Sequence, residues 1–374
     1  MPFFFMTDNP NAFKNFINKE VTKRLATAIQ GQYPSFNTKR FLQLNRELDQ
    51  LELKQRVKLV THHLKLNLEL PYPESLNILV NAMEEGDLKG FELWPFSEFI
   101  SQFGLDHFDL SLKALYQMTS RFTAEFAIRP YLLKDHKRVL KFFNKWVKDK
   151  NVHIRRWVSE GSRPLLPWGE RLPLFVMDPT HTILLLDQLK FDEELYVRKS
   201  VANHLNDISK NHPQVVIDLI RLWEKDTPPV HQDKMNWIKR HALRTLIKKG
   251  DKRALKVMGV SDKTLASVKH LSTNKSLFNL HDDLVFSFRL ESQGKKTQKM
   301  VVDYVIDFMK SSGKMGKKVY KLKTLELKPG EKIELKKKHS LKPITTMKYY
   351  SGTHHLMIQV NGEIMGQISF YLEV

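Results

Sequence analysis

One helical phrase recurs three times in the middle of this chain, as HIRRWVSEGSR, YVRKSVANHLN and WIKRHALRTLI. Aligned on Ile154, Val197 and Ile238, successive copies are 43 and 41 residues apart. In each copy the anchor and the residue four positions later are apolar and share one face of a helix, as a buried stripe requires. A period of this length is typical of solenoids, in which stacked helix pairs bury one continuous core. The phrase therefore predicts an α-solenoid of HEAT-like repeats over much of the chain.

The residues beside the buried stripe are mostly basic or amide side chains. The position two residues after the anchor holds Arg156, Lys199 and Arg240, and the position four residues further holds Glu160, Asn203 and Arg244. A surface that carries cations and amides at turn spacing suits a row of phosphates. Glu160 is the exception, because a carboxylate there repels phosphates. It either pairs with its arginine neighbours or faces a cation on the ligand.

The composition indicates a folded and strongly basic protein. The chain has 374 residues, 41% of them hydrophobic, which leaves room for two domains with ample core. Its formal net charge is +20, divided as +11 over residues 1–263 and +9 over residues 264–374. We expect a polyanionic partner, with solubility from a lysine-rich surface as the plainer alternative.

Several classes of function lack support in the sequence. The chain has no cysteine, which fits a reducing cytoplasm and excludes disulfides and thiolate chemistry. No uncharged apolar run is long enough for a membrane span, and the opening MPFFFMTDNP lacks the features of a signal peptide. The His-His pairs are adjacent residues, and no HExxH, P-loop or G-x-S-x-G motif occurs. We therefore expect a cytoplasmic protein with no membrane partner, no metal site and no organic cofactor.

The sequence pattern changes near residue 263. Up to about Gly259 the apolar residues follow three- and four-residue spacing, whereas later segments are rich in β-branched and aromatic residues or alternate in polarity. The predicted strands are residues 284–290, 300–308, 318–327, 331–336, 354–360 and 367–374, with an Asn361-Gly362 hairpin turn between the last two. We predict two domains, a solenoid over residues 1–263 and a β-sandwich over residues 270–374. The sandwich is expected to be immunoglobulin-like, with a barrel as the alternative.

Within the second region, residues 311–318 (SSGKMGKK) form a predicted loop with two glycines. The loop carries Lys314, Lys317 and Lys318, and such a loop can follow a nucleic acid backbone. An ordinary solvated hairpin tip is the alternative.

Two glutamates, Glu125 and Glu160, have arginines nearby at helical spacing. Arg121 and Arg129 flank Glu125, and Arg156 and Arg163 flank Glu160. These spacings are expected to place each trio on one helix face, an arrangement that simple surface ion pairing also explains.

A turn follows the helix that carries Glu160. Pro164 ends that helix, and the turn beyond it presents Trp168 before a glycine. An aromatic side chain there either contacts a nucleic acid base or belongs to the core.

Three segments, RFTAEFAIRPYL, HIRRWVSEGSRPLLPWGERLP and YVRKSVANHLNDISKNHP, resemble the AlkC-type bacterial DNA glycosylases. These are relatives of the AlkD type among the HEAT-like repeat glycosylases, and the β-rich tail resembles the immunoglobulin-like domain of one AlkC branch. The resemblance implies a monomeric enzyme of base excision repair that acts on double-stranded DNA containing alkylated bases. The implied lesions are small cationic bases, chiefly 3-methyladenine, with 3-methylcytosine and 1-methyladenine as lesser substrates. The family is expected to kink the duplex rather than flip the base.

The resemblance also implies roles for individual residues. Glu125 and Glu160 resemble the active-site carboxylates of the family, and Arg156 and Trp168 resemble residues that project toward the lesion. Carboxylates suit this reaction, because both the methylated base and the sugar of the transition state are cationic. The residues expected on the DNA backbone are Arg155, Arg163, Lys199, Asn203, His204, Lys239, Arg240, Arg244, Lys314, Lys317 and Lys318.

The rival interpretation is a non-catalytic HEAT-repeat scaffold that binds nucleic acid or an acidic protein. Glu160 favours the enzyme, because a scaffold has no use for an acid within a phosphate-binding surface.

Overall fold

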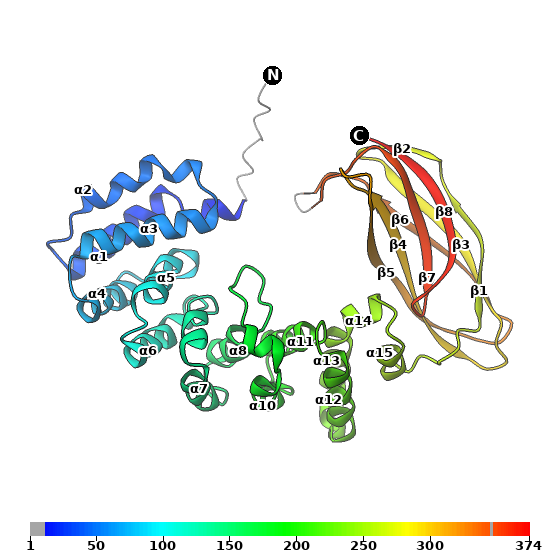
Figure 1. Ribbon diagram of the computed structural model, residues 1–374, viewed down its shortest axis with the longest axis horizontal. Coiled ribbons are helices and arrows are strands. Elements are labelled where there is room, and N and C mark those ends of the chain that lie inside the picture. The colour runs from blue at the N-terminus through cyan, green and yellow to red at the C-terminus, as the bar shows by residue number, and fades with distance from the viewer. Residues whose placement is uncertain (1–11, 345–346) are drawn as a thin grey trace. The chain divides into compact units, whose positions relative to one another are not determined.

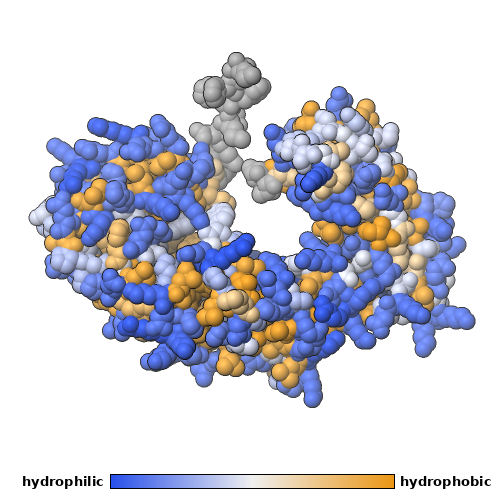
Figure 2. Space-filling model, in the orientation of Figure 1, coloured by the Kyte–Doolittle hydropathy of each residue, from blue (hydrophilic) through white to orange (hydrophobic). Residues whose placement is uncertain are grey.

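The structure, a computed structural model, describes residues 12–344 and 347–374. The segment MPFFFMTDNP, on which the expectation of no signal peptide depends, lies outside the described residues. The chain divides into two compact units, Met1–Asn211 and His212–Val374 (Figure 1). Hydrophilic residues cover much of the face in view (Figure 2), in keeping with the net charge of +20. Within the described ranges, no helix combines the length and the apolar character that crossing a membrane requires.

The first unit is helical, and its helices pack on neighbours that are close in the sequence. They are η1 (Phe13–Phe16), α1 (Lys19–Gln32), α2 (Thr38–Phe41), η2 (Leu42–Arg46), η3 (Leu48–Gln50), α3 (Leu53–Leu68), α4 (Tyr72–Glu85), η4 (Gly90–Leu93), α5 (Trp94–Phe103), α6 (Phe108–Thr119), α7 (Arg129–Trp146), α8 (Val152–Gly161), α9 (Pro173–Met177), α10 (Thr180–Leu189) and α11 (Leu195–Ile208). Helix α1 packs on α4, α3 on α5 and α8 on α11, so that alternate helices form layers. This is the arrangement of helix pairs that a solenoid needs.

The three copies of the recurring phrase lie in α8, α11 and α13 (Gln232–Ala242). Their anchors Ile154, Val197 and Ile238 are buried, with at most 1% of their surface exposed. Helix α8 begins at Asn151, whose side chain accepts a hydrogen bond from the backbone N–H of His153 (2.9 Å) and so caps the first turn. The α-solenoid prediction is confirmed.

The second unit combines five helices, one of them a short 3-10 helix, with a β-sandwich in its described residues. Its helices are α12 (Pro213–Lys225), η5 (Pro229–His231), α13, α14 (Arg244–Lys248) and α15 (Lys252–Val257). Its strands are β1 (Ala266–Thr273), β2 (Leu277–Asn279), β3 (Asp283–Ser292), β4 (Gln298–Met309), β5 (Met315–Leu327), β6 (Lys332–Ser340), β7 (Gly352–Val360) and β8 (Glu363–Glu373). The unit therefore begins well before the change from helix to strand, because the last helices group with the strands.

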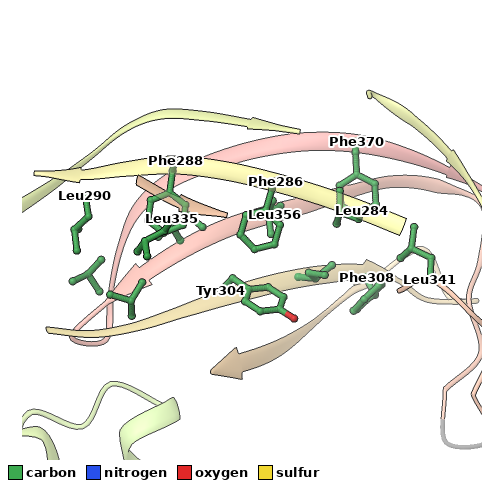
Figure 3. Close-up of a cluster of buried hydrophobic side chains, with 14 of the residues drawn as sticks. Leu284, Phe286, Phe288, Leu290, Tyr304, Phe308, Leu335, Leu341, Leu356 and Phe370 are labelled. Atoms are coloured by element: carbon green, nitrogen blue, oxygen red, sulfur yellow. The ribbon is translucent and has the colours of Figure 1, made fainter. Parts of the chain in front are cut away.

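The strands form two sheets with orders β1-β3-β6 and β2-β8-β7-β4-β5. All neighbours are antiparallel except β2 and β8, which are parallel. Alternate residues of β3 and β4 point between the sheets, where Phe286, Phe288, Tyr304 and Phe308 pack together (Figure 3). Two sheets enclosing one core confirm the sandwich over the barrel, and the six predicted strands are β3 to β8. The short β2 and the irregular β1 escaped prediction.

The predicted loop at residues 311–318 is shorter than expected. The turn closes between Lys310 and Lys314, with the N–H of Lys310 donating to the carbonyl of Lys314 (2.9 Å), and β5 begins at Met315. Lys317 and Lys318 therefore belong to the strand, opposite Asp307 and Ile306 of β4. Successive strand residues point to opposite faces, so the two lysines cannot act as one flexible loop.

Two glycines meet where the helices of the second unit contact the sandwich. A Cβ atom added to Gly362 would lie 2.3 Å from the Cα of Gly250, and both residues have positive φ angles, of 82° and 73°. Glycine is required at this contact because a side chain at either position has neither the space nor the backbone conformation.

We expect Gly362→Ala to lower the free energy of unfolding by about 2–4 kcal/mol, because left-handed strain and overpacking add. Urea denaturation measures the change. Gly330→Ala is the matched control, since Gly330 has a φ of 72° but open space around it. The control should lose only the strain, about 1–2 kcal/mol. An equal loss of unfolding free energy in both variants would show that the close contact between Gly250 and Gly362 does not add to the cost of the substitution.

Candidate active site

A cavity of about 350 Å³ lies in the first unit beside α8 and the turn that follows it. Its walls are largely aromatic and it contains two carboxylates; the principal residues are Phe91, Trp94, Phe122, Phe126, Trp168, Glu125 and Glu160. The rings of Trp94 and Phe126 stack with their centroids 5.1 Å apart. Aromatic faces and carboxylates both attract positive charge, so the cavity suits a flat cationic group.

One guanidinium joins the two carboxylates. Arg156 donates from Nη1 to Glu125, and its Nη2 lies 3.5 Å from Oε1 of Glu160. Glu125 and Glu160 are 8% and 6% exposed. Two buried like charges repel strongly in a medium of low polarity, and the shared cation offsets that repulsion. The ring of Tyr196 covers the guanidinium at 5.2 Å, within the range of a cation–π contact.

Both oxygens of Glu160 accept hydrogen bonds. Arg163 Nη1 donates to Oε1 (2.7 Å), and the hydroxyl of Ser200 donates to Oε2 (2.6 Å). Burial alone raises the pKa of Glu160, but Arg156, Arg163 and the Ser200 hydroxyl outweigh burial and hold this pKa below its ordinary value. Glu160 is therefore an anion at neutral pH, with a fixed orientation.

Helix α11 supports Glu160 through one face. Ser200, His204 and Asp207 follow each other at spacings of four and three residues, so they share one face of the helix, and all three bond to residues of α8 or of the turn after it. Asp207 accepts from Nε of Arg163 (2.8 Å), and Nδ1 of His204 donates to the carbonyl of Ser159 (2.9 Å). Burial lowers the pKa of His204 to about 4, so the ring is neutral and purely structural at neutral pH.

Glu125 does not lie on a helix, contrary to the prediction. It belongs to the connection between α6 and α7, where its carboxylate accepts from the hydroxyl of Thr123 (2.9 Å). Arg121 turns away and pairs with Asp87 (3.1 Å). The predicted trio around Glu125 is therefore wrong, whereas Arg156, Glu160 and Arg163 do come together as expected.

The turn that presents Trp168 is held by a buried arginine. Arg129 is 1% exposed and donates to the carbonyls of Gly161 (3.1 Å), Arg163 (3.0 Å) and Glu170. Burial lowers the pKa of Arg129 to about 10, which leaves it charged at neutral pH. Trp168 itself has a φ of 65° and is 55% exposed, so it is displayed at the cavity rather than packed in the core.

Three of the predicted backbone-binding residues are occupied inside the protein. His204 is fully buried, and Arg163 is 6% exposed and bonded to Glu160 and Asp207, so neither side chain reaches a phosphate. Arg155 donates to both oxygens of Asp192 (2.6 and 3.0 Å). The burial of His204 and Arg163 speaks against their assignment to the DNA backbone, whereas Arg155 is half-buried and its assignment stays a prediction.

The remaining predicted backbone-binding residues lie at or near the surface. Lys239 pairs with Glu224. The others, exposed or half-buried, are Lys199, Asn203, Arg240, Arg244, Lys314, Lys317 and Lys318.

Sequence reasoning missed the roles of Ser200, Asp207 and Arg129. The polar residues of α11 at four- and three-residue spacing were a usable signal, because polar residues on a face that packs against another helix need partners. Across the described parts of the chain, no group of three or more His, Asp and Glu residues is placed to hold a metal ion.

Comparisons with known proteins agree with this geometry. Residues 121–246 match a family described as DNA alkylation repair enzyme, and residues 246–374 match the C-terminal Ig-like domain of uncharacterised protein YhaZ. The uncharacterized protein YhaZ of Bacillus subtilis (strain 168) is 38% identical over 359 residues, covering 96% of this chain and 98% of that protein. The solved structure of Pseudomonas fluorescens alkylpurine DNA glycosylase AlkC, bound to DNA containing an abasic site analog, superposes with a TM-score of 0.90. That structure is 39% identical and covers 97% of this chain and 100% of its own.

The environment of Glu160 predicts a pH dependence of stability. The pKa of Glu160 in the folded protein lies below its ordinary value, so the stabilisation is fully present above the pKa of the unfolded chain and is lost as the pH falls through the folded-state pKa. We expect Glu160→Gln to lack this pH-dependent stabilisation. The free energies of unfolding of the two proteins, measured from pH 7 down to about pH 3, should therefore converge as the pH falls. Parallel curves would show that Glu160 is not held as an anion.

Proposed function

The chain belongs to the AlkC branch of the DNA alkylation repair family, and we propose that it is a DNA glycosylase for small cationic alkylated bases. The observation that carries the proposal is the pair of buried carboxylates, Glu125 and Glu160, held by one arginine in an aromatic cavity. The enzyme would hydrolyse the bond between the base and its sugar. We propose 3-methyladenine as the chief substrate, with 3-methylcytosine and 1-methyladenine as lesser ones.

The proposed chemistry needs only the protein's own groups. A base methylated at a ring nitrogen carries positive charge and departs as a neutral molecule when the glycosidic bond breaks. The bonding electrons leave with the base, and the sugar develops oxocarbenium character that a nearby carboxylate stabilises. One carboxylate also accepts a proton from the water that attacks the sugar. Glu160 suits the electrostatic role, because its hydrogen bonds keep it charged and fixed in orientation.

Arg156 and Trp168 are proposed to face the lesion. In the structure without DNA, Arg156 occupies the position between the carboxylates, and it has to turn aside for the cationic nucleoside to reach them. Trp168 offers an exposed ring on a held turn, which suits stacking against a sugar or base.

Double-stranded DNA is the proposed partner. The solenoid surface would contact its phosphates through Lys199, Asn203, Lys239, Arg240 and Arg244, and the sandwich through Lys314, Lys317 and Lys318. A scaffold without catalytic activity remains the rival, but it gives no reason for two buried carboxylates in an aromatic cavity.

We expect Glu160→Gln and Glu125→Gln each to lower base release by a factor of about a hundred or more, the usual scale for a lost electrostatic stabiliser. Release of 3-methyladenine from methylated duplex DNA by the purified chain under single-turnover conditions measures the effect. DNA affinity should be retained, because each change removes negative charge near phosphates.

Glu74→Gln is the matched control, since it removes the same charge from an exposed position in the first turn of α4. Its rate should equal that of the wild type. Near-normal release from both active-site variants would refute the assignment of Glu125 and Glu160. Absence of release by the wild type would favour the scaffold.

We expect affinity for duplex DNA to fall steeply with salt, with a slope of log affinity against log salt of about 0.9 for each phosphate neutralised. Lys199→Ala should reduce the slope by about one, independently of base sequence. Fluorescence anisotropy with an undamaged labelled duplex measures both quantities.

Lys141→Ala on α7 removes the same charge away from the proposed surface and should leave the slope unchanged. A double Lys314→Ala, Lys317→Ala variant tests the sandwich in the same assay. A salt-independent affinity would contradict the proposed phosphate contacts.

A further inference from the structure

A second cavity, of about 220 Å³, lies within the second unit, between its last helices and the outer face of the five-stranded sheet. Residues of strands β4 and β5 form one wall, and residues of α13 and α14 with those after α15 form the other. Its charged lining residues are Arg240, Arg244, Lys248, Lys299, Lys321 and Asp303. None of them belongs to the candidate active site.

The walls of this cavity are fixed by packing. Leu255 and Val260 form a buried cluster with Val301 of β4, and the side chain of Gln359 donates to the carbonyl of Lys248 (3.2 Å). The contact between Gly250 and Gly362 closes the same junction. The cavity is therefore preformed, which lowers the entropic cost of binding a ligand there.

Four of the cations around the cavity have no acidic partner among the described residues. In the described part of the chain, no carboxylate lies within ion-pair distance of Arg240, Lys248, Lys299 or Lys321, whereas nearby cations outside the cavity do have partners. Examples are Lys239 with Glu224, Lys252 with Glu363 and Arg253 with Asp251. Cations that converge without counter-charges repel one another, and an anion bound between them relieves that repulsion.

Asp303 is the single acid of the cavity. It projects from β4 opposite Lys321 and is 3% exposed, with no ion pair within 4 Å among the described residues. Burial raises the pKa of Asp303 to about 6. One buried carboxylate against the four cations without an ion pair leaves an excess of positive charge.

The cavity also offers apolar contact and room beyond a single phosphate. Ile247, Met258 and Val301 line it between the cations. A neighbouring cavity of about 270 Å³ shares Arg240, Met258 and Lys299 with it. A ligand that fits both features carries a phosphate attached to a less polar group.

We propose that this cavity is a binding site for a nucleotide phosphate. The phosphate lies among the lysines and arginines, and the apolar residues contact the attached sugar or base. The phosphate comes from a DNA strand or from a free nucleotide, two sources of the same chemistry. For a DNA strand the proposal extends the phosphate contacts proposed above for Arg240 and Arg244. It does not depend on base release, because the residues assigned to that reaction all lie in the first unit.

The test uses the full chain and two probes, dAMP by isothermal titration calorimetry and an undamaged labelled duplex by fluorescence anisotropy. We expect Lys299→Met and Lys321→Met each to weaken phosphate binding about tenfold, the effect of losing one charge-assisted hydrogen bond. Lys323→Met is the matched control, since it removes the same charge from the same strand outside the cavity. Deoxyadenosine, which lacks the phosphate, should not bind.

The variants separate the two sources. Loss of duplex affinity beyond that of the control assigns the site to a DNA strand, and loss of dAMP affinity alone assigns it to a free nucleotide. Asp303→Asn should strengthen the binding of whichever probe, dAMP or duplex, the site binds, because it removes a negative charge that repels the phosphate. If both cavity variants match Lys323→Met with both probes, the proposal is overturned. Base release by the wild type, measured separately, tells whether the proposed function stands.

Discussion

The arrangement of the first unit depends on one guanidinium shared by two buried carboxylates. Glu125 and Glu160 come from different segments, and without Arg156 their repulsion in a poorly hydrated cavity would force one of them to take up a proton or move apart. Arg156 and Glu160 lie one turn apart on α8, so this helix fixes both the cation and one anion. The position of α8 is fixed in turn by α11, which supplies Ser200 and Asp207.

The same interaction links the fold to the proposed chemistry. The free protein already satisfies its two carboxylates with a cation, so a positively charged lesion enters a site whose charge pattern is set in advance. A neutral base offers no replacement for the arginine, and displacing Arg156 for it would leave the buried Glu125 without its arginine and Glu160 with Arg163 as its remaining ion-pair partner. In the proposed reaction the released base is neutral, and Arg156 is the cation that can return between the carboxylates. On this proposal, selectivity for charged bases follows from the electrostatics of the site.

Much of the fold could be predicted from the sequence because it depends on local periodicity. The spacing of Ile154, Val197 and Ile238 identified three solenoid helices, and the alternation in β3 and β4 identified the sandwich. The failures have a different origin. Glu125 and Arg121 have helical spacing with Arg129 but lie outside a helix, because Thr119, at the end of α6, accepts the N–H of Ala124 and the chain forms turns between α6 and α7. The burial of His204 depends on contacts between helices far apart in the sequence, which periodicity does not record. The cationic cavity of the second unit likewise needs residues from helices and strands that only the tertiary fold brings together.

The backbone of Trp168 has a consequence for how this protein tolerates change. Trp168 has a left-handed backbone conformation, which costs free energy at a large aromatic residue but not at glycine. Arg129 offsets this cost by donating hydrogen bonds to the carbonyls of Arg163 and Glu170, on either side of the turn. At this residue glycine would favour stability, whereas tryptophan is needed to place an exposed ring beside the cavity. A search for more heat-resistant variants would favour glycine at position 168 and in doing so would remove the side chain that faces the cavity. If Trp168 faces the lesion as proposed, selection for activity and selection for stability act in opposite directions on this one side chain.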